Sequence, residues 1–365
     1  MTRLRSRQKI YYLVVTIAIV LLLLLLLSGY GGWFAPSLFG AVPALLVLAY
    51  PVIALLSILI GVCMIFLRKW MMAAVILAGL LATWPSISSN FPVNLTHPLS
   101  DTTRCFTVMS YNVAAFEDSL WTDTLQMHPT MRLILDEDAD FVVMIQPVTR
   151  GLGYDERNSI EPWIDDIERH YPYRTHSRYD GVDLLSKYPF RAVPLDLPVL
   201  SYRYFPYVIK STNRYAFDID LPDHKQLRII GAYMTSYKLG NLDSISYSLP
   251  SQPLLFTKMD KAFEERERIS KHLRDSLDAS PANVILCTDL NDVPQSYAYR
   301  TLMSDDMRDA FRECHCGYTN TFHIHHMLFH IDHILYRGSL QAVGYKRIVS
   351  KASDHYPIVT KFVWR

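Results

Sequence analysis

The feature that most constrains this chain is an uninterrupted uncharged run near its N-terminus, residues 10–27, which ends in seven leucines. At about 1.5 Å per residue, a helix over this run is long enough to cross a hydrocarbon layer of about 30 Å. A second uncharged stretch covers residues 33–67 and a third covers residues 70–84. Together they predict a membrane anchor of about three transmembrane helices over residues 1–84.

A cleaved signal peptide is the alternative for the first run, because basic residues precede it. Its apolar core exceeds the usual signal length, however, and no small-x-small cleavage site follows before the next apolar run. The pattern therefore favours a retained anchor. Basic residues before the first run, and Arg68 and Lys69 between the second and third, predict a multi-pass membrane protein with a cytoplasmic N-terminus. Everything after Trp84 is then on the extracytoplasmic side.

Residues 85–103 are polar and punctuated by proline, which predicts a linker before a folded domain over residues 104–365. The chain carries 36 Lys and Arg against 35 Asp and Glu, for a net charge of +1, so nothing indicates a surface that coats nucleic acid. The spacing of the five cysteines does not indicate a disulfide framework.

The second part of the chain alternates between strand and helix patterns. The expected strands cover residues 105–111, 141–145, 181–186, 214–220, 227–233 and 284–287, and the expected helices cover residues 131–137 and 256–277. Alternation of strands and helices, mixed with hairpins, indicates a layered α/β domain rather than a purely parallel sheet.

The stretch from Val284 to Pro294 reads as a buried strand that delivers polar side chains to a sheet edge. Asp289 and Asn291 stand two residues apart, and on an extended backbone this spacing turns both side chains to the same face. A carboxylate and an amide could then converge on one ligand. Aspartate and asparagine after a strand are also ordinary turn formers, so this stretch alone leaves both interpretations open.

Other expected strands also end in, or lie beside, polar side chains. These are Asn112, Gln146, Tyr233, Asp332 with His333, and Asp354 with His355. Carboxylate and amide oxygens suit a hard divalent metal, and asparagine and histidine suit the oxygens of a phosphate-bearing substrate. The set therefore indicates metal-assisted chemistry on a phosphoester.

Six motifs carry a family resemblance: S-Y-N, D-F-V-V-M-I-Q, L-S-K-Y-P, D-L-N-D-V-P, H-I-D-H-I-L and S-D-H-Y-P-I-V. In this order, over about residues 104–364, they resemble the endonuclease/exonuclease/phosphatase superfamily, and the apolar N-terminus resembles its membrane-anchored bacterial members. The resemblance implies a deoxyribonuclease-like fold, in which two packed mixed β-sheets are flanked by helices in a four-layer α/β/β/α sandwich.

The resemblance also implies a metal site. Asn112, Gln146 and Asp354 would be metal ligands, and Asn112 would in addition hold the substrate phosphate. The implied cofactor is Mg²⁺ or Mn²⁺. At Gln146, however, the family motif carries a glutamate, and an amide lacks the full negative charge of that carboxylate.

The resemblance implies catalytic roles for five residues. Asp289 would orient or deprotonate the attacking water, and Asn291 would donate to the phosphoryl oxygens. His355 would bind or protonate the phosphoryl group, with Asp332 fixing its tautomer and raising its basicity. Tyr233 stands where many members have a histidine, and it could hydrogen-bond the phosphate.

Histidines are concentrated near the C-terminus, where Cys314 and Cys316 also lie. The histidines are His315, His323, His325, His326, His330 and His333. Imidazole and thiolate favour zinc or copper, but the spacing matches no known zinc pattern, so we expect surface or substrate-facing histidines rather than a second metal site.

Two functional classes remain. The favoured one is a membrane-tethered, metal-dependent phosphoesterase, of nuclease or phosphatase type, acting on a nucleic acid, a phospholipid head group or a small phosphodiester. No obligate protein partner is inferred. The alternative is a catalytically weakened or inactive member that serves as a binding or scaffold module because Gln146 replaces the metal-ligand glutamate.

Overall fold

The structure is a computed structural model of the whole chain. It describes residues 2–94, 105–116, 127–147, 164–175, 181–193, 195, 200–204, 207–211, 214–221, 225–236, 252–304, 306–323 and 329–365. The hairpin turn expected around residues 222–224 and the histidines His325 and His326 lie outside these described residues.

The chain divides into two compact units. The first, here called the helical unit, comprises Met1–Phe91, Tyr237–Glu267 and Val293–Arg300. The second, here called the sheet unit, comprises Pro92–Ser236, Arg268–Asp292 and Thr301–Arg365. Helices α8 (Gln252–Asp278) and α9 (Tyr297–Met303) therefore contribute residues to both units.

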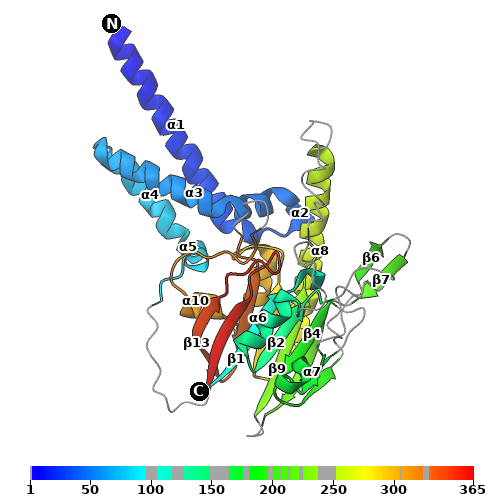
Figure 1. The fold of residues 1–365 in the computed structure, drawn as a ribbon. Coiled ribbons are helices and arrows are strands. Elements are labelled where there is room, and N and C mark those ends of the chain that lie inside the picture. The colour runs from blue at the N-terminus through cyan, green and yellow to red at the C-terminus, as the bar shows by residue number, and fades with distance from the viewer. Residues whose placement is uncertain are drawn as a thin grey trace. The chain divides into compact units, whose positions relative to one another are not determined.

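The N-terminal part of the helical unit consists of helices (Figure 1). They are α1 (Thr2–Tyr30), the 3-10 turn η1 (Gly31–Trp33), α2 (Pro36–Phe39), α3 (Ala41–Phe66), α4 (Trp70–Ala82) and α5 (Trp84–Asn90). Two helical spans, Tyr11–Trp33 and Ala41–Phe66, are long and apolar enough to cross a membrane. Helices α4 and α5 form a third candidate span if their 65° bend is included.

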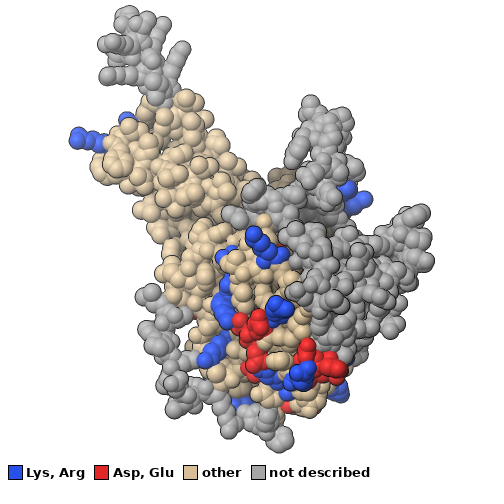
Figure 2. Space-filling view, in the orientation of Figure 1, with Lys and Arg blue, Asp and Glu red and all other residues tan. Residues whose placement is uncertain are grey.

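The surface of these helices suits a lipid environment. On the face shown in Figure 2, it is almost entirely uncharged, with basic side chains gathered at one end. Outward-facing residues such as Leu13, Leu59 and Leu81 are more than half exposed, although each is fully apolar. Exposed apolar surface of this extent on a helix bundle marks a surface for contact with lipid or with protein.

The sequence placed the linker at residues 85–103. The structure describes its first part as a helix, because α5 continues to Asn90. Pro85 occupies the first turn of that helix, where its missing N–H is not needed. Residues 95–103 of the expected linker lie outside the described residues.

The sheet unit contains two six-stranded sheets. The first has the order β13-β14-β1-β2-β4-β3, from β13 (Leu340–Arg347), β14 (Ile358–Trp364), β1 (Cys105–Asn112), β2 (Phe141–Ile145), β4 (Val182–Ser186) and β3 (Tyr173–Arg174). The second has the order β11-β12-β10-β9-β8-β5, from β11 (Arg308–Asp309), β12 (Asp332–Arg337), β10 (Val284–Asp289), β9 (Gln226–Tyr233), β8 (Arg214–Asp220) and β5 (Phe190–Val193).

Each sheet mixes parallel and antiparallel pairs. Strands β1 and β2 are parallel, as are β9 and β10, while the described neighbours on either side of these pairs are antiparallel. A separate hairpin joins β6 (Leu200–Tyr204) and β7 (Tyr207–Ser211). The six expected strands match β1, β2, β4, β8, β9 and β10 to within two residues at each end, whereas short strands such as β3, β5 and β11 were not expected.

One hydrophobic core fills the space between the two sheets. Val143 and Val182 of the first sheet share it with Ile229, Ile285 and Ile334 of the second. Gly231 of β9 lies in this core, where a Cβ would stand only 2.2 Å from Val182 Cγ1 and 2.9 Å from Val143 Cγ1. Gly231 is therefore required by the close approach of the sheets.

Helices cover the outer faces of both sheets. Helices α6 (Pro129–Glu137) and α7 (Ile164–His170) pack a second core on the first sheet, through residues such as Ile134 and Ile167 (Figure 1). On the second sheet, Arg337 of β12 donates to the carbonyl of Leu277 near the end of α8, at 2.6 Å. The predicted fold class, two packed mixed sheets flanked by helices after an apolar helical segment, is confirmed.

Candidate active site

The fold brings the polar strand ends of the second sheet together. Asp289, the last residue of β10, pairs with Asp332 across the antiparallel neighbour β12 and with Tyr233 across the parallel neighbour β9. Residues paired directly across strands turn their side chains to the same face. Three of the residues singled out in the sequence therefore lie side by side, and all three are buried.

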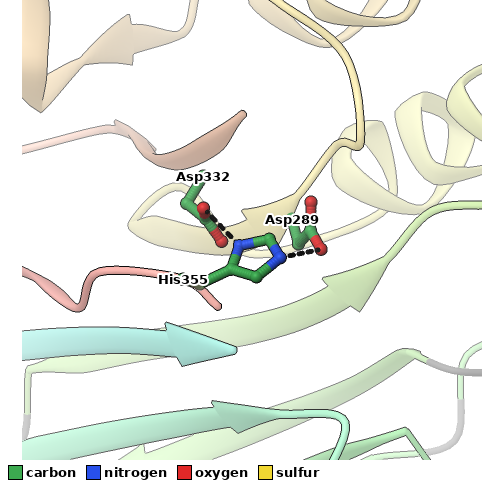
Figure 3. Close-up of side chains that lie close together, drawn as sticks. All are labelled: Asp289, Asp332 and His355. Atoms are coloured by element: carbon green, nitrogen blue, oxygen red, sulfur yellow. Dashed lines mark hydrogen bonds and ion pairs between the residues drawn. The ribbon is translucent and has the colours of Figure 1, made fainter. Parts of the chain in front are cut away.

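His355 lies between two carboxylates (Figure 3). Its Nδ1 is 2.8 Å from Oδ2 of Asp332, and its Nε2 is 3.8 Å from Oδ2 of Asp289. The ligand atoms of these three side chains all lie within 4.8 Å of one another. Because a carboxylate only accepts hydrogen bonds, the contact with Asp332 fixes the hydrogen of the imidazole on Nδ1.

Burial and charge together shift the protonation of this group. Burial alone would lower the pKa of His355, but Asp332 and Asp289 outweigh it and raise the pKa to about 10. Burial raises the pKa of Asp289 to about 7, although the positive charge of His355 counteracts part of that effect. The arrangement therefore holds a proton on His355 while keeping Asp289 able to accept one near neutral pH.

Asn112, the last residue of β1, links the two sheets at this point. Its Nδ2 donates to Oδ2 of Asp289 at 2.8 Å and to Oε1 of Gln146 at 2.9 Å. Its Oδ1 accepts from the backbone N–H of Ala114 at 3.0 Å. These bonds fix the orientation of the amide, since a flip would place an acceptor opposite two oxygens.

Gln146 follows β2 directly and has a left-handed backbone, with φ of 52°. This conformation is unfavourable for a residue with a long side chain, and such positions cluster at functional sites. Its backbone N–H donates to the carbonyl of Gly181 at 2.8 Å, which holds the turn in place. The half-buried side chain reaches Asn112, whose Nδ2 donates to its Oε1.

Asn291 also has a left-handed backbone, with φ of 50°, in the loop after β10. Its backbone N–H donates to Oδ1 of Asp289 at 2.8 Å, and its Nδ2 donates to Oδ2 at 3.1 Å. Nδ2 also donates to the carbonyl of Met234, at 2.9 Å. The expected convergence of Asp289 and Asn291 is thus present. The two residues also form a turn after the strand, which was the alternative interpretation of this stretch.

Asp354 precedes His355, and its Oδ1 lies 4.0 Å from His355 Nε2. The neighbouring Ser353 donates from Oγ to the backbone carbonyl of Asn112 at 2.7 Å, which joins this loop to the end of β1. The loop thereby carries Asp354 and His355 to the same strand end as Asn112. Of the candidate carboxylates, Asp354 is the one that is partly exposed, whereas Asp289 and Asp332 are buried.

The donors on the Asn112 side fit a hard divalent cation. Asp354 offers a carboxylate, Gln146 an amide oxygen with one lone pair in use, and Asn112 an amide oxygen of the same kind. Oxygen-only donors suit Mg²⁺ or Mn²⁺ rather than zinc. The acid–histidine cluster, Asp289, Asp332 and His355, is a different set, in which the Nδ1 hydrogen of His355 is donated to Oδ2 of Asp332.

Two contacts at the site were not found by sequence reasoning. The ring of Phe322 meets the ring of His355 edge-on, with centroids 5.1 Å apart. Thr321 Oγ1 accepts from the backbone N–H groups of Ile331 and Asp332, each at 3.0 Å, and so fixes the start of β12. Neither residue belongs to a motif, and no local signal in the sequence pointed to them.

The histidine-rich segment divides between two environments. His323 stacks on Tyr356, with ring centroids 4.3 Å apart, whereas His330 and His333 are buried, with centroids 4.8 Å apart. The expectation of surface or substrate-facing histidines is wrong for these two. Burial holds the pKa of His330 well below its usual value, so that ring is neutral.

A second metal centre does not emerge from the part of the chain that the structure describes. Among the described residues, one group of at least three acidic, histidine or cysteine side chains has its ligand atoms within 4.8 Å of one another. This group is the acid–histidine cluster. His333 Nδ1 lies 3.6 Å from Oδ2 of Asp309, but His330 does not complete a third close ligand. The five cysteines are free thiols.

A sequence model described as the Endonuclease/Exonuclease/phosphatase family matches residues 109–355 of this chain. That range contains every candidate site residue from Asn112 to His355. The chain belongs to this family. The family resemblance seen in the six motifs is therefore confirmed, and so is the predicted class of enzyme, a hydrolase acting on phosphoester bonds.

Several solved structures resemble the chain. The beta toxin of Staphylococcus aureus, determined with bound magnesium ions, has 16% sequence identity and a TM-score of 0.47, covering 72% of this chain and 100% of that chain. A mannosyl-6-phosphatase of Bacteroides thetaiotaomicron has 15% identity and a TM-score of 0.45, covering 71% and 100%. The human Nocturnin catalytic domain has 16% identity and a TM-score of 0.46, covering 73% and 97%. No curated protein matches the sequence.

Proposed function

We propose that this chain is a membrane-anchored phosphoesterase that uses a divalent metal and hydrolyses its substrate by direct attack of water. The observation that carries the proposal is His355, held by Asp332 at 2.8 Å and facing Asp289 at 3.8 Å. A histidine with a fixed tautomer beside a carboxylate of raised pKa supplies an acid and a base within reach of one phosphoryl group.

The buried carboxylate and histidine divide the chemistry between them. Asp289 takes a proton from the attacking water while the water oxygen bonds to phosphorus and the bond from phosphorus to the leaving oxygen breaks. His355, kept protonated by Asp332 and Asp289, donates to a phosphoryl oxygen or to the leaving oxygen. Asn291 and Asn112 hold Asp289 by hydrogen bonds. In this proposal, the Nδ2 hydrogen that Asn291 now donates to Asp289 is donated to a phosphoryl oxygen when substrate binds. Tyr233, beside Asp289, is a further phosphate donor in this proposal.

The metal site in this proposal consists of Asp354, Gln146 and Asn112, with Mg²⁺ or Mn²⁺ as the ion. A bound dication supplies positive charge beside the phosphoryl group. The protein contributes one formal negative charge from these three side chains, so substrate phosphate is expected to contribute strongly to metal affinity.

The site belongs, in this proposal, to a multi-pass membrane protein with a cytoplasmic N-terminus and an extracytoplasmic hydrolase domain. The basic end of the bundle supports this orientation, because Lys69 lies over the ring of Tyr11, 4.8 Å from its centroid, next to Arg68. At the other end, Tyr30 donates to the carbonyl of Ala82 at 2.6 Å. A phospholipid head group is the substrate that such an anchor favours, since it needs no release from the bilayer.

Activity of the full-length protein in nanodiscs tests the proposal. The substrates are bis-p-nitrophenyl phosphate, p-nitrophenyl phosphate and a phospholipid in the nanodisc, each with Mg²⁺, with Mn²⁺ and with excess EDTA. We expect turnover of at least one substrate that EDTA abolishes. Metal-independent turnover, or none on any substrate, contradicts the proposal, and the latter outcome supports the scaffold alternative raised by Gln146.

A further inference from the structure

The chain leaves the sheet unit immediately after the loop that follows β10 and carries Asn291, here called the catalytic loop. Asp292 is the last residue of that stretch of the sheet unit, and Val293–Arg300 belongs to the helical unit. Within the helical unit, this segment packs against residues that end or follow the candidate transmembrane helices. These contacts are here called the docking contacts of Val293–Arg300.

The first docking contact is between two backbones. A Cβ built on Gly32 would stand 1.9 Å from the carbonyl oxygen of Gln295, so only glycine allows this approach. Gln295 is 3% exposed and has φ of 68°, a left-handed conformation that a non-glycine residue adopts only when its surroundings enforce it. The contact therefore constrains the path of the chain at Gln295.

Side chains on two further elements hold the same segment. Nδ2 of Asn90, at the end of α5, donates to Oε1 of Gln295, and Asn90 is itself buried. The guanidinium of Arg300 lies over the ring of Trp33, 3.5 Å from its centroid. An arginine stacked this closely on an aromatic face is stabilising, and more so when both groups lose water.

The docked segment and the catalytic loop are close along the chain. Gln295 follows Asn291 by four residues, so their Cα atoms are at most about 14 Å apart. Two of these positions, Asn291 and Gln295, have left-handed backbones, and Ser296 donates from its backbone N–H to the carbonyl of Val293 at 3.1 Å. Such a short and constrained connection transmits a displacement of Gln295 rather than absorbing it.

We propose that Gly32, Trp33 and Asn90 of the helical unit are positioning residues for the loop that follows Asp289 and carries Asn291. The membrane anchor then does more than localise the enzyme, because it fixes the C-terminal end of the catalytic loop. The inference rests on the proposed function in so far as that loop is catalytic. Its test therefore includes a readout that needs no turnover.

The substitution Gly32→Ala places one methyl group at the closest docking contact. We expect it to increase hydrogen exchange of residues 289–296 and to lower kcat by about ten- to a hundredfold, with little change in KM for a small soluble phosphodiester. The matched control is Gly61→Ala in α3, where a Cβ would stand 3.4 Å from Ile76 Cγ2, an ordinary contact. The control is expected to match the wild type in both measurements.

Both variants are compared as full-length protein in nanodiscs. If Gly32→Ala does not accumulate in the membrane, Asn90→Ala replaces it, since it removes the bond to Gln295 without adding volume. Unchanged exchange of residues 289–296 in the disrupted variant overturns the inference. If exchange rises but the wild type has no turnover, the docking inference stands and the proposed phosphoesterase function fails.

Discussion

The two halves of the candidate site differ in charge although they share one hydrogen-bonded network. The acid–histidine half, Asp289, Asp332 and His355, carries two carboxylates and a histidine of raised pKa. The amide half, Asn112, Gln146 and Asp354, carries a single carboxylate. Asn112 joins them, since its Nδ2 donates to Asp289 and to Gln146.

In the proposed mechanism, proton transfer and metal binding therefore depend on different residues. Charges of the acid–histidine half compensate one another, which is what permits burial of all three side chains. The amide half needs no internal compensation, because an amide is neutral, but it attracts a cation less strongly. Substitutions that change the charge of either half therefore test this difference.

The largest effect is expected from His355→Ala, which leaves two buried carboxylates without the group that bridges them. We expect kcat to fall by about 10²- to 10⁴-fold, because proton transfer to the phosphoryl group is lost. Turnover of a phosphodiester at saturating Mg²⁺ measures it. His272→Ala on the exposed face of α8 is the control, and equal activity of the two variants would rule out a catalytic role for His355.

A smaller effect is expected from Asp332→Asn, which keeps the shape of the side chain but removes one carboxylate charge beside His355. We expect kcat to fall by about 10- to 100-fold, as for other groups that orient a functional histidine. An unchanged rate would show that Asp332 only stabilises the fold.

The pH profile gives this prediction a second readout. In the wild type, kcat/KM should rise as Asp289 ionises near pH 7 and fall as His355 loses its proton near pH 10, following the raised pKa of each group. In Asp332→Asn the alkaline limb should move to lower pH, because a charge that holds the proton on His355 is gone. If the alkaline limb of Asp332→Asn stays at the pH of the wild type, the assignment of that limb to His355 is contradicted.

Gln146→Glu would make the two halves more alike. A carboxylate at this position adds a second negative charge to the amide half, so we expect Mg²⁺ affinity to rise by about tenfold or more. The Mg²⁺ dependence of turnover measures it, together with direct titration of Mg²⁺ by calorimetry. Gln226→Glu, at the exposed start of β9, adds the same charge elsewhere as a control. Equal affinity in both variants would place Gln146 outside the metal shell.

The smallest effect on activity is expected from Gly231→Ala, which changes the hydrophobic core between the two sheets and neither half of the site. A methyl group there meets Val182 and Val143, so we expect unfolding free energy to fall by about 1–3 kcal/mol with little change in kcat. Denaturant unfolding measures it. Gly344→Ala is the control, since its Cβ would stand 3.5 Å from Lys361 Cβ. Equal stability of the two variants would mean that the sheets can separate locally.

The six expected strands were predictable because a short apolar run leads into a polar residue, as in Val284–Asp289, whereas two-residue strands such as β3 and β11 are too short to give a pattern. The convergence of Asp289, Asp332 and His355 followed from six motifs in a family order rather than from spacing, since His355 comes from the loop before β14. The hydrogen bonds of Asn112 across the sheets could not be predicted, because they depend on side-chain orientation. The burial of His330 and His333 could not be predicted, because histidine occurs both in protein interiors and on surfaces.

The left-handed backbone of Gln146 has a genetic consequence. It disfavours β-branched side chains at this position, but glutamine and glutamate share one carbon skeleton and tolerate it equally. Their codons differ by a single nucleotide. One point mutation can therefore raise or lower the negative charge of the proposed metal site without repacking the protein, so selection could change its affinity for a cation while the fold stays unchanged.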